Sequence, residues 1–123
     1  MAAPDTLTID MILQGGGVKP KDNTVILTGL DAAILLFLAA AGQVHGALFH
    51  TPLIVTSGRD AKHATGSKHY EGKAVDIHVN DLEAGEVPVF HLAASYVAAR
   101  CKCGIFFEWP GLDTQHFHIE TNS

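Results

Sequence analysis

The chain has 123 residues, of which 47% are hydrophobic and 17% charged, and it carries a formal net charge of −5. This composition can bury a core, is not typical of a disordered chain, and predicts a single domain over residues 1–123. The acidic balance argues against nucleic-acid binding through phosphate neutralisation. The aromatic content of 7% argues against a stacking platform for single strands.

The longest apolar run, Ala32–Ala41, falls short of the roughly 20 residues that cross a bilayer, so we expect no membrane span. No basic segment followed by an apolar one indicates a signal peptide at the N-terminus. Cys101 and Cys103 are one residue apart, which is poor geometry for a bridge, so we expect free thiols. The composition shows no obvious patch for a partner, and we expect a monomer.

In chain order, loose alternation predicts a strand over Thr6–Leu13, and a short apolar run predicts a second over Val25–Leu27. The Ala- and Leu-rich segment Leu30–Ala41 predicts a helix that is capped from Thr28 and ends at Gly42. This segment is apolar nearly all round, so we expect the helix at the centre of the core.

The second half of the chain predicts four more strands and one helix. The strands are expected at Pro52–Thr56, Lys73–Val79, Gly104–Glu108 and Gln115–Glu120, and the helix at Val87–Arg100. Strands and two main helices without a regular βαβ rhythm indicate an α+β fold with a mainly antiparallel sheet.

Eight histidines is a high count for this length, and the first group of interest lies within Ser67–Ile77. His69 ends a polar loop, and Gly72 permits a turn into the next strand. Alternation places Asp76 on one face of that strand, together with Ala74. A histidine nitrogen and an aspartate oxygen brought together in this way make two metal ligands.

The second group is His116-Phe117-His118, in which alternation puts both histidines and Glu120 on one strand face. One of the two histidines can supply a third ligand. Three protein ligands leave a fourth tetrahedral position for water, as in catalytic zinc sites, and Zn²⁺ is the cofactor we predict. Zinc would lower the pKa of that water toward ~7, and the other histidine could shuttle protons or stabilise an oxyanion.

The segment Ser67–Ile77 resembles the S-x-H-x-x-G-x-A-x-D signature of the zinc D-alanyl-D-alanine peptidases, the peptidase M15 group. The stretch HYEGKAVDI, His69–Ile77, is still closer to the Hedgehog signalling domain, from which it differs only at Lys73. Leu53–Arg59 is similar to the peptidases' strand and SGYR motif without its aromatic residue. Ile105–Glu108 resembles the Hedgehog strand before H-x-H, with residues 109–114 inserted. The resemblance covers roughly residues 27–123 and implies the Hedgehog/DD-peptidase fold.

The resemblance implies His69, Asp76 and His118 as the zinc ligands, with His116 near the metal water. It also implies Glu108 as the general base, which takes a proton from that water and gives it to the leaving amine.

A competing register stays open, because some branches of the family carry an acid three residues before the last ligand. In that register His116 is the ligand and Asp113 is the base. The resemblance further implies that Arg59 clamps a substrate carboxylate or an oxyanion. It places His63 as a polar contact that lines the cleft.

The function implied by the resemblance is a zinc metallopeptidase, a hydrolase that cuts the stem peptide of peptidoglycan next to a D-amino acid. The alternative is a non-catalytic zinc-binding module of the Hedgehog type. The sequence leaves open whether cleavage is internal or carboxy-terminal, and whether D,D or L,D bonds are preferred.

Overall fold

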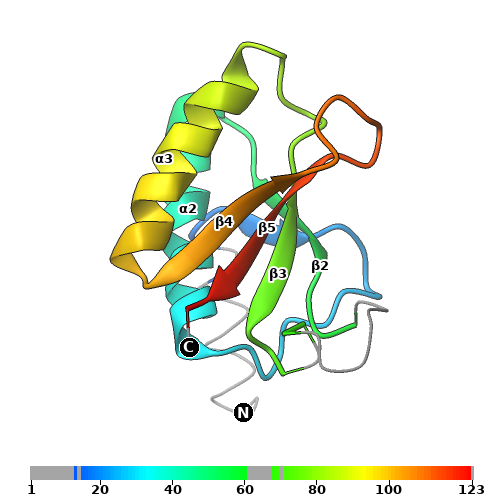
Figure 1. The fold of residues 1–123 in the computed structure, drawn as a ribbon, viewed down its shortest axis with the longest axis vertical. Coiled ribbons are helices and arrows are strands. Elements are labelled where there is room, and N and C mark those ends of the chain that lie inside the picture. Colours follow the sequence, from blue (N-terminus) through cyan, green and yellow to red (C-terminus); the bar gives the residue numbers. More distant parts are fainter. Residues whose placement is uncertain (1–12, 14, 61–67, 70, 123) are drawn as a thin grey trace.

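The computed structural model describes residues 13, 15–60, 68–69 and 71–122, which form two helices and five strands (Figure 1). The elements are β1 (Val18–Pro20), α2 (Ala32–Phe49), β2 (Leu53–Ser57), β3 (Ala74–His78), α3 (Glu86–Arg100), β4 (Cys103–Glu108) and β5 (His116–Thr121). The predicted α+β class is confirmed, and the second half of the chain follows its predicted elements closely.

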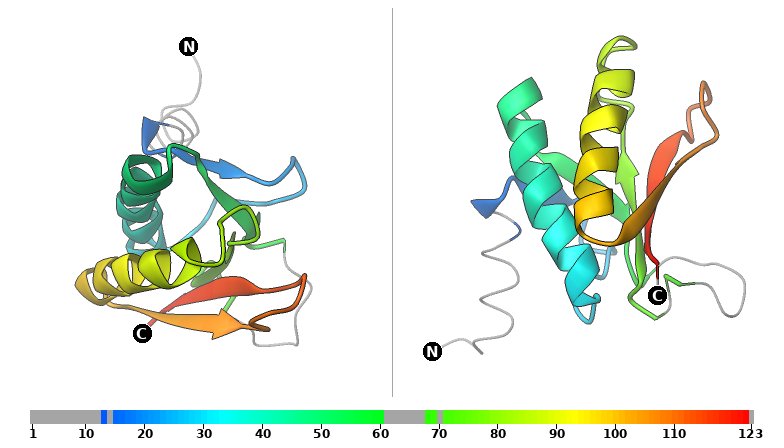
Figure 2. Two further views of the ribbon diagram at one scale, coloured as in Figure 1. Left: turned by 90° about the horizontal axis from the view of Figure 1, so that it is seen from above. Right: turned by 60° about the vertical axis from the view of Figure 1, so that its left-hand side comes forward.

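The five strands form one mixed, mostly antiparallel sheet in the order β1-β2-β3-β5-β4. Only β1 and β2 run parallel, while the other neighbours are antiparallel. Helices α2 and α3 lie side by side against the same face of the sheet (Figure 2). We call the other face, which is turned away from both helices, the outer face.

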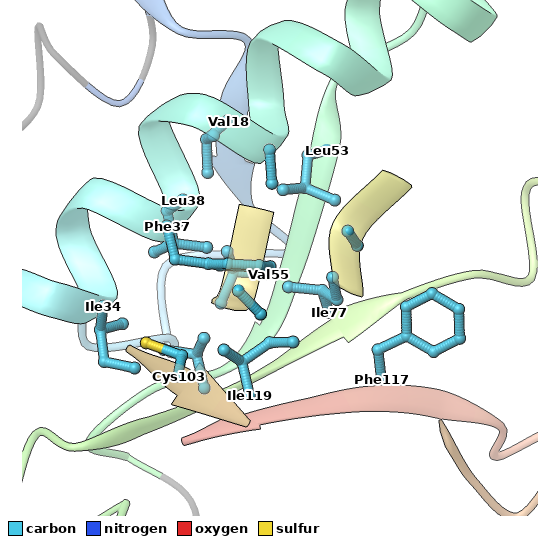
Figure 3. Packing of buried hydrophobic residues seen from close by; sticks show 14 of the residues in the cluster. Val18, Ile34, Phe37, Leu38, Leu53, Val55, Ile77, Cys103, Phe117 and Ile119 are labelled. Carbon is cyan, nitrogen blue, oxygen red and sulfur yellow. The ribbon is translucent and has the colours of Figure 1, made fainter. Parts of the chain in front are cut away.

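The core lies between the helices and the sheet (Figure 3). Alternate residues of the two central strands point into it, and Ile77, Phe117 and Ile119 are fully buried. Each such side chain contributes about 1.5–3 kcal/mol when removed from water, so the register of β3 and β5 is strongly specified. The same alternation therefore decides which side chains emerge on the outer face.

Helix α2 begins later and ends later than the sequence predicts. Its N-cap is Asp31, whose carboxylate accepts a hydrogen bond of 3.0 Å from the backbone N–H of Ala33. The helix then runs through Gly42 to Phe49. The predicted cap from Thr28 and the predicted end at Gly42 are therefore wrong.

Gly42 has a packing role instead of a terminating one. A Cβ atom at this position would lie 2.4 Å from both the carbonyl oxygen of Gly16 and the side chain of Val18. The absent side chain thus lets the chain leading into β1 pass directly against the helix.

Helix α2 is also not buried all round, because Leu36 and Leu48 remain 63% and 45% exposed. Within the described residues it is long and apolar enough to cross a membrane, judged by length and composition alone. The same properties suit a core helix, and three of its own side chains, Ile34, Phe37 and Leu38, are fully buried. That the chain has no membrane span stays a prediction.

The first part of the chain departs most from the predicted elements. The strand over Thr6–Leu13 lies outside the described residues except for Leu13, which is helical. No strand forms at Val25–Leu27, where Ile26 instead accepts a hydrogen bond from the backbone of Arg59 and donates one to Asp60. β1 is an edge strand of the sheet. Pro20 is tolerated there because part of the backbone of an edge strand has no partner strand to hydrogen-bond.

Candidate metal centre

Strand register brings the predicted site residues together on the outer face. Asp76 of β3 lies directly opposite His118 of β5, and His116 of β5 lies directly opposite Glu108 of β4. Directly opposed side chains on one face have Cβ atoms about 4.5–5.5 Å apart. Three neighbouring strands thus place two histidines and two carboxylates within reach of one another.

His69, Asp76 and His118 form a group that could hold a metal ion, with their ligand atoms within 4.8 Å of one another. Asp76 Oδ1 lies 2.9 Å from His118 Nδ1 and 3.4 Å from His69 Nε2. Two imidazole nitrogens and one carboxylate oxygen are a donor set that suits zinc. The three predicted ligands are therefore gathered in one place.

His69 is held in one orientation by the end of β2. Its Nδ1 lies 3.1 Å from the carbonyl oxygen of Gly58, which can only accept a hydrogen bond. The Nδ1–H of His69 therefore donates to this carbonyl, and Nε2 is the ring nitrogen that faces Asp76. Gly72 makes the predicted turn at φ +76°, where a Cβ would lie 2.3 Å from the carbonyl oxygen of Gly29.

A residue that the sequence reasoning gave no role supports the third ligand. His118 Nε2 lies 3.0 Å from Glu120 Oε1, and the second oxygen of Glu120 lies 3.0 Å from Lys68 Nζ. With Nδ1 on a metal, the Nε2–H of His118 would donate to Glu120, and carboxylates accept this hydrogen bond behind many zinc-bound histidines. The two-residue spacing of His118 and Glu120 on one strand face is the sequence feature that could have indicated this contact.

The electrostatics of the group follow from its burial and its contacts. Burial alone would raise the pKa of Asp76, but hydrogen bonds from His118 and His69 and the charges of the nearby histidines hold it well below its usual range. The hydrogen bond to Asp76 raises the pKa of His118 in spite of burial, which lowers it. Asp76 is thus a carboxylate, the form that binds a metal.

His116 and Glu108 form a second pair beside the first group. His116 Nε2 lies 2.8 Å from Glu108 Oε1 and 3.7 Å from Asp76 Oδ1. His116 Nδ1 donates a hydrogen bond of 2.8 Å to the carbonyl oxygen of Thr114, which fixes the ring with Nε2 toward Glu108. The ligand atoms of Asp76, Glu108 and His116 also lie within 4.8 Å of one another.

A cleft of about 410 Å³ opens beside these residues, between β1 and the loop that joins β4 to β5. It is lined by Lys21, Thr56, Ser57, Asp76, His78, Asn80, Trp109, Asp113, Thr114, Gln115 and His116. Asn80 pins the loop by donating a hydrogen bond of 2.6 Å to the carbonyl oxygen of Asp113. Asp113 lines the cleft but belongs to neither ligand group found among the described residues, whereas Glu108 belongs to the second of these groups.

Of the two predicted substrate contacts, Arg59 is the one that the structure describes, and it stands apart from this cleft. Arg59 lies over Gly29 and donates a hydrogen bond of 3.4 Å to the carbonyl oxygen of Thr28, and it is not among the residues that line the cleft. His63 lies outside the described residues. Phe106, which the sequence did not single out, is 50% exposed, and its ring centroid lies 6.1 Å from that of His118.

No protein-family model, curated protein or solved structure matches this chain. The resemblance to zinc peptidases therefore depends on the motif residues around His69, Asp76 and His118. The structure itself shows an α+β fold and a group of side chains that could hold a metal ion.

Proposed function

We propose that this chain is a zinc-dependent peptidase that acts on peptidoglycan stem peptides. The observation that carries the proposal is the position of the three-residue ligand group, His69, Asp76 and His118, beside the Glu108–His116 pair and a cleft. A structural zinc site closes its coordination with four protein ligands, whereas a catalytic site keeps one position open. The motif that surrounds His69 supports the same class.

The residues of the chain divide the work of hydrolysis between them. A bound zinc ion would supply a Lewis acid and a water molecule of lowered pKa. Glu108 takes a proton from the attacking water and passes it to the amine that leaves when the peptide C–N bond breaks. His116 holds Glu108 in place at 2.8 Å, and its own ring is fixed by the carbonyl oxygen of Thr114.

The experiment that tests the proposal combines metal analysis with digestion. Zinc is measured by elemental analysis in the wild type, in His69→Ala and in the control His78→Ala. His78 shares the face of Asp76 but belongs to neither ligand group. About one zinc ion per chain in the wild type and the control, but none in His69→Ala, is the expected result.

Purified muropeptides are digested in parallel, with and without a chelator. Release of D-alanine or of shortened stems that the chelator abolishes supports the peptidase. Protein prepared without a chelator that contains no zinc would contradict the whole site.

A second candidate is a zinc-binding module that recognises a ligand without cutting it. Two exposed aromatic side chains lie at the site, Phe106 at 50% next to His118 and Trp109 at 61% on the cleft wall. Such residues are enriched where proteins bind partners. Zinc present at full occupancy, with muropeptides left intact, would favour this candidate.

A further inference from the structure

The two helices present an almost uncharged surface to solvent on the side that is turned away from the sheet, which we call the helical surface. Both helices pack on the same face of the sheet (Figure 2). Helix α2 contains no lysine, arginine, aspartate or glutamate, and α3 contains only Glu86 and Arg100, one at each end. The exposed side of a helix on a globular protein ordinarily carries polar and charged residues. The helical surface is thus unlike a surface that faces only water.

Helix α3 carries a stripe of exposed residues, which are Val89, Leu92, Tyr96 and Ala99. The exposed fractions of its three large side chains, in chain order, are 51%, 77% and 68%. The stripe lies opposite the buried residues of the helix, which are Val87, Phe90, Ala94 and Ala98. Its spacing of three, four and three residues is the spacing with which one helix packs along another. Packing on the sheet requires one apolar stripe, and α3 has a second.

We propose that this stripe pairs with the same stripe of a second copy of the chain, with the two α3 helices antiparallel about a two-fold axis. An axis that passes between Leu92 and Tyr96 places Leu92 of one copy beside Tyr96 of the other. The same axis places Val89 beside Ala99. A two-fold axis repeats each contact, so one self-complementary stripe is sufficient for both copies.

The charges at the two ends of α3 complement each other in this arrangement. Antiparallel pairing brings Glu86 in the first turn of one helix toward Arg100 in the last turn of the other. Oε1 of Glu86 accepts a hydrogen bond of 2.9 Å from the backbone N–H of Glu83, which holds this carboxylate at the start of the helix. A parallel pair would instead bring like charges together at both ends. The charges that flank the stripe therefore favour the antiparallel orientation.

Helix α2 widens the proposed contact. Its exposed and uncharged side, opposite its buried residues, includes Leu36, Ala40, Gln43 and Ala47. Together the two helices cover an area of about 20 Å by 22 Å, which is roughly 450 Å² per copy. Two copies thus approach the ~1,000 Å² that a specific interface buries, and we expect a dissociation constant in the micromolar range.

A lipid surface fits the helical surface less well than a second copy does. Helices that lie on anionic membranes carry lysine and arginine along their polar side, whereas these two helices hold Arg100 alone. The net charge of the chain, −5, also opposes binding to anionic lipid. The proposal departs from the monomer expected from composition, because composition carries no information about which side chains share an exposed stripe.

Association is measured by sedimentation velocity of the full chain from about 5 μM to about 500 μM, in EDTA so that no metal bridges two copies. The wild type should shift from monomer toward dimer as its concentration rises. Leu92→Glu places like charges near the axis and should weaken the dimer at least about tenfold. Leu112→Glu makes the same change at a 57% exposed side chain in the loop between β4 and β5, and it should associate like the wild type. Circular dichroism checks that both variants fold.

A mixing experiment tests the antiparallel orientation. Glu86→Arg and Arg100→Glu each create like charges at both ends of the pair, so each homodimer should be about three- to tenfold weaker than the wild type. In a mixture of these two variants, the heterodimer regains opposite charges at both ends. Fluorescence anisotropy of one labelled variant should therefore show tighter binding to the other variant than to itself.

A chain that stays monomeric over the whole concentration range overturns the proposal. A dimer that Leu92→Glu leaves intact overturns it as well, because the contact then lies elsewhere. Equal affinities in the mixing experiment overturn the antiparallel pairing. A monomer that floats with phosphatidylglycerol vesicles, and that Leu92→Glu releases, assigns the helical surface to lipid and overturns the dimer. These outcomes do not depend on zinc, so they leave the proposed peptidase to its own test.

Discussion

Glu120 is predicted to control zinc affinity without binding zinc. It accepts a hydrogen bond of 3.0 Å from His118 Nε2 and is held from the other side by Lys68 at 3.0 Å. In Glu120→Gln the amide is a weaker acceptor, so His118 is less basic and less well oriented as a ligand. Loss of such a supporting carboxylate typically weakens metal binding 10–100-fold, which corresponds to about 1.4–2.7 kcal/mol.

The metal-free protein should lose much less. The side chain of Glu120 is 30% exposed and that of Lys68 is 34% exposed, and ion pairs so open to solvent contribute about 0–1 kcal/mol. Zinc affinity is measured by competition with a chromophoric chelator, and stability by urea unfolding of the chelator-treated protein. The expected pattern is a large loss of affinity beside a small loss of stability.

The control is Glu71→Gln, which makes the same chemical change at a 59% exposed side chain, 4.0 Å from Lys73. It should leave zinc affinity within about twofold of the wild type. A zinc affinity of Glu120→Gln that matches this control, in a protein of unchanged circular dichroism, would refute the role assigned to Glu120. It would also place doubt on His118 as a ligand through Nδ1.

Three further results are expected. Free zinc at 100 times its Kd should raise the free energy of unfolding by about 2.7 kcal/mol in urea melts. EDTA should reverse this gain, and a gain retained in His69→Ala would contradict the site. Gly42→Ala should cost about 1–3 kcal/mol in the same assay, because its Cβ would meet backbone at 2.4 Å. Gly46→Ala, with open space around it in the same helix, should instead stabilise by about 0.5–1 kcal/mol, and equal effects would refute this packing account. Burial raises the pKa of Cys103 to about 11 from 9.0, so alkylation by iodoacetamide should accelerate about tenfold per pH unit from pH 8 toward 11. Since the unfolded thiol loses its proton first, stability should fall over the same range above about pH 9, whereas a labelling rate that levels off near pH 9 would count against the burial of this thiol.

The sequence predicts the two strands of the site well because their periodicity is strict. In β5, Phe117 and Ile119 are fully buried and alternate with His116, His118 and Glu120, which remain partly exposed. A strand buried on one face alone leaves this pattern in the sequence. The position of Asp76 opposite His118 depends on the register between β3 and β5. The motif at His69–Ile77 suggests that these residues meet but does not specify the register.

Contacts between distant segments are what the sequence does not predict. The stop expected at Gly42 is overridden by packing against Val18, and Asp31 caps the helix in place of Thr28. Arg59 lies against Gly29 because its backbone pairs with Ile26, an association over more than thirty residues. Local propensity carries no information about such contacts.

The central place of β5 has a consequence for how chains of this kind can diverge. A shift of one residue within β5 would carry Phe117 and Ile119 to the outer face and both histidines toward the helices, which would destroy core and ligand group together. The loop at residues 109–115 lies outside the pairing of β4 with β5, and each doubling of a flexible loop costs only about 0.6 kcal/mol. Insertions are therefore tolerated between Glu108 and His116 but not between His116 and His118. Related chains that keep this sheet should therefore preserve the two-residue spacing of His116 and His118. The number of residues between Glu108 and His116 should vary among them.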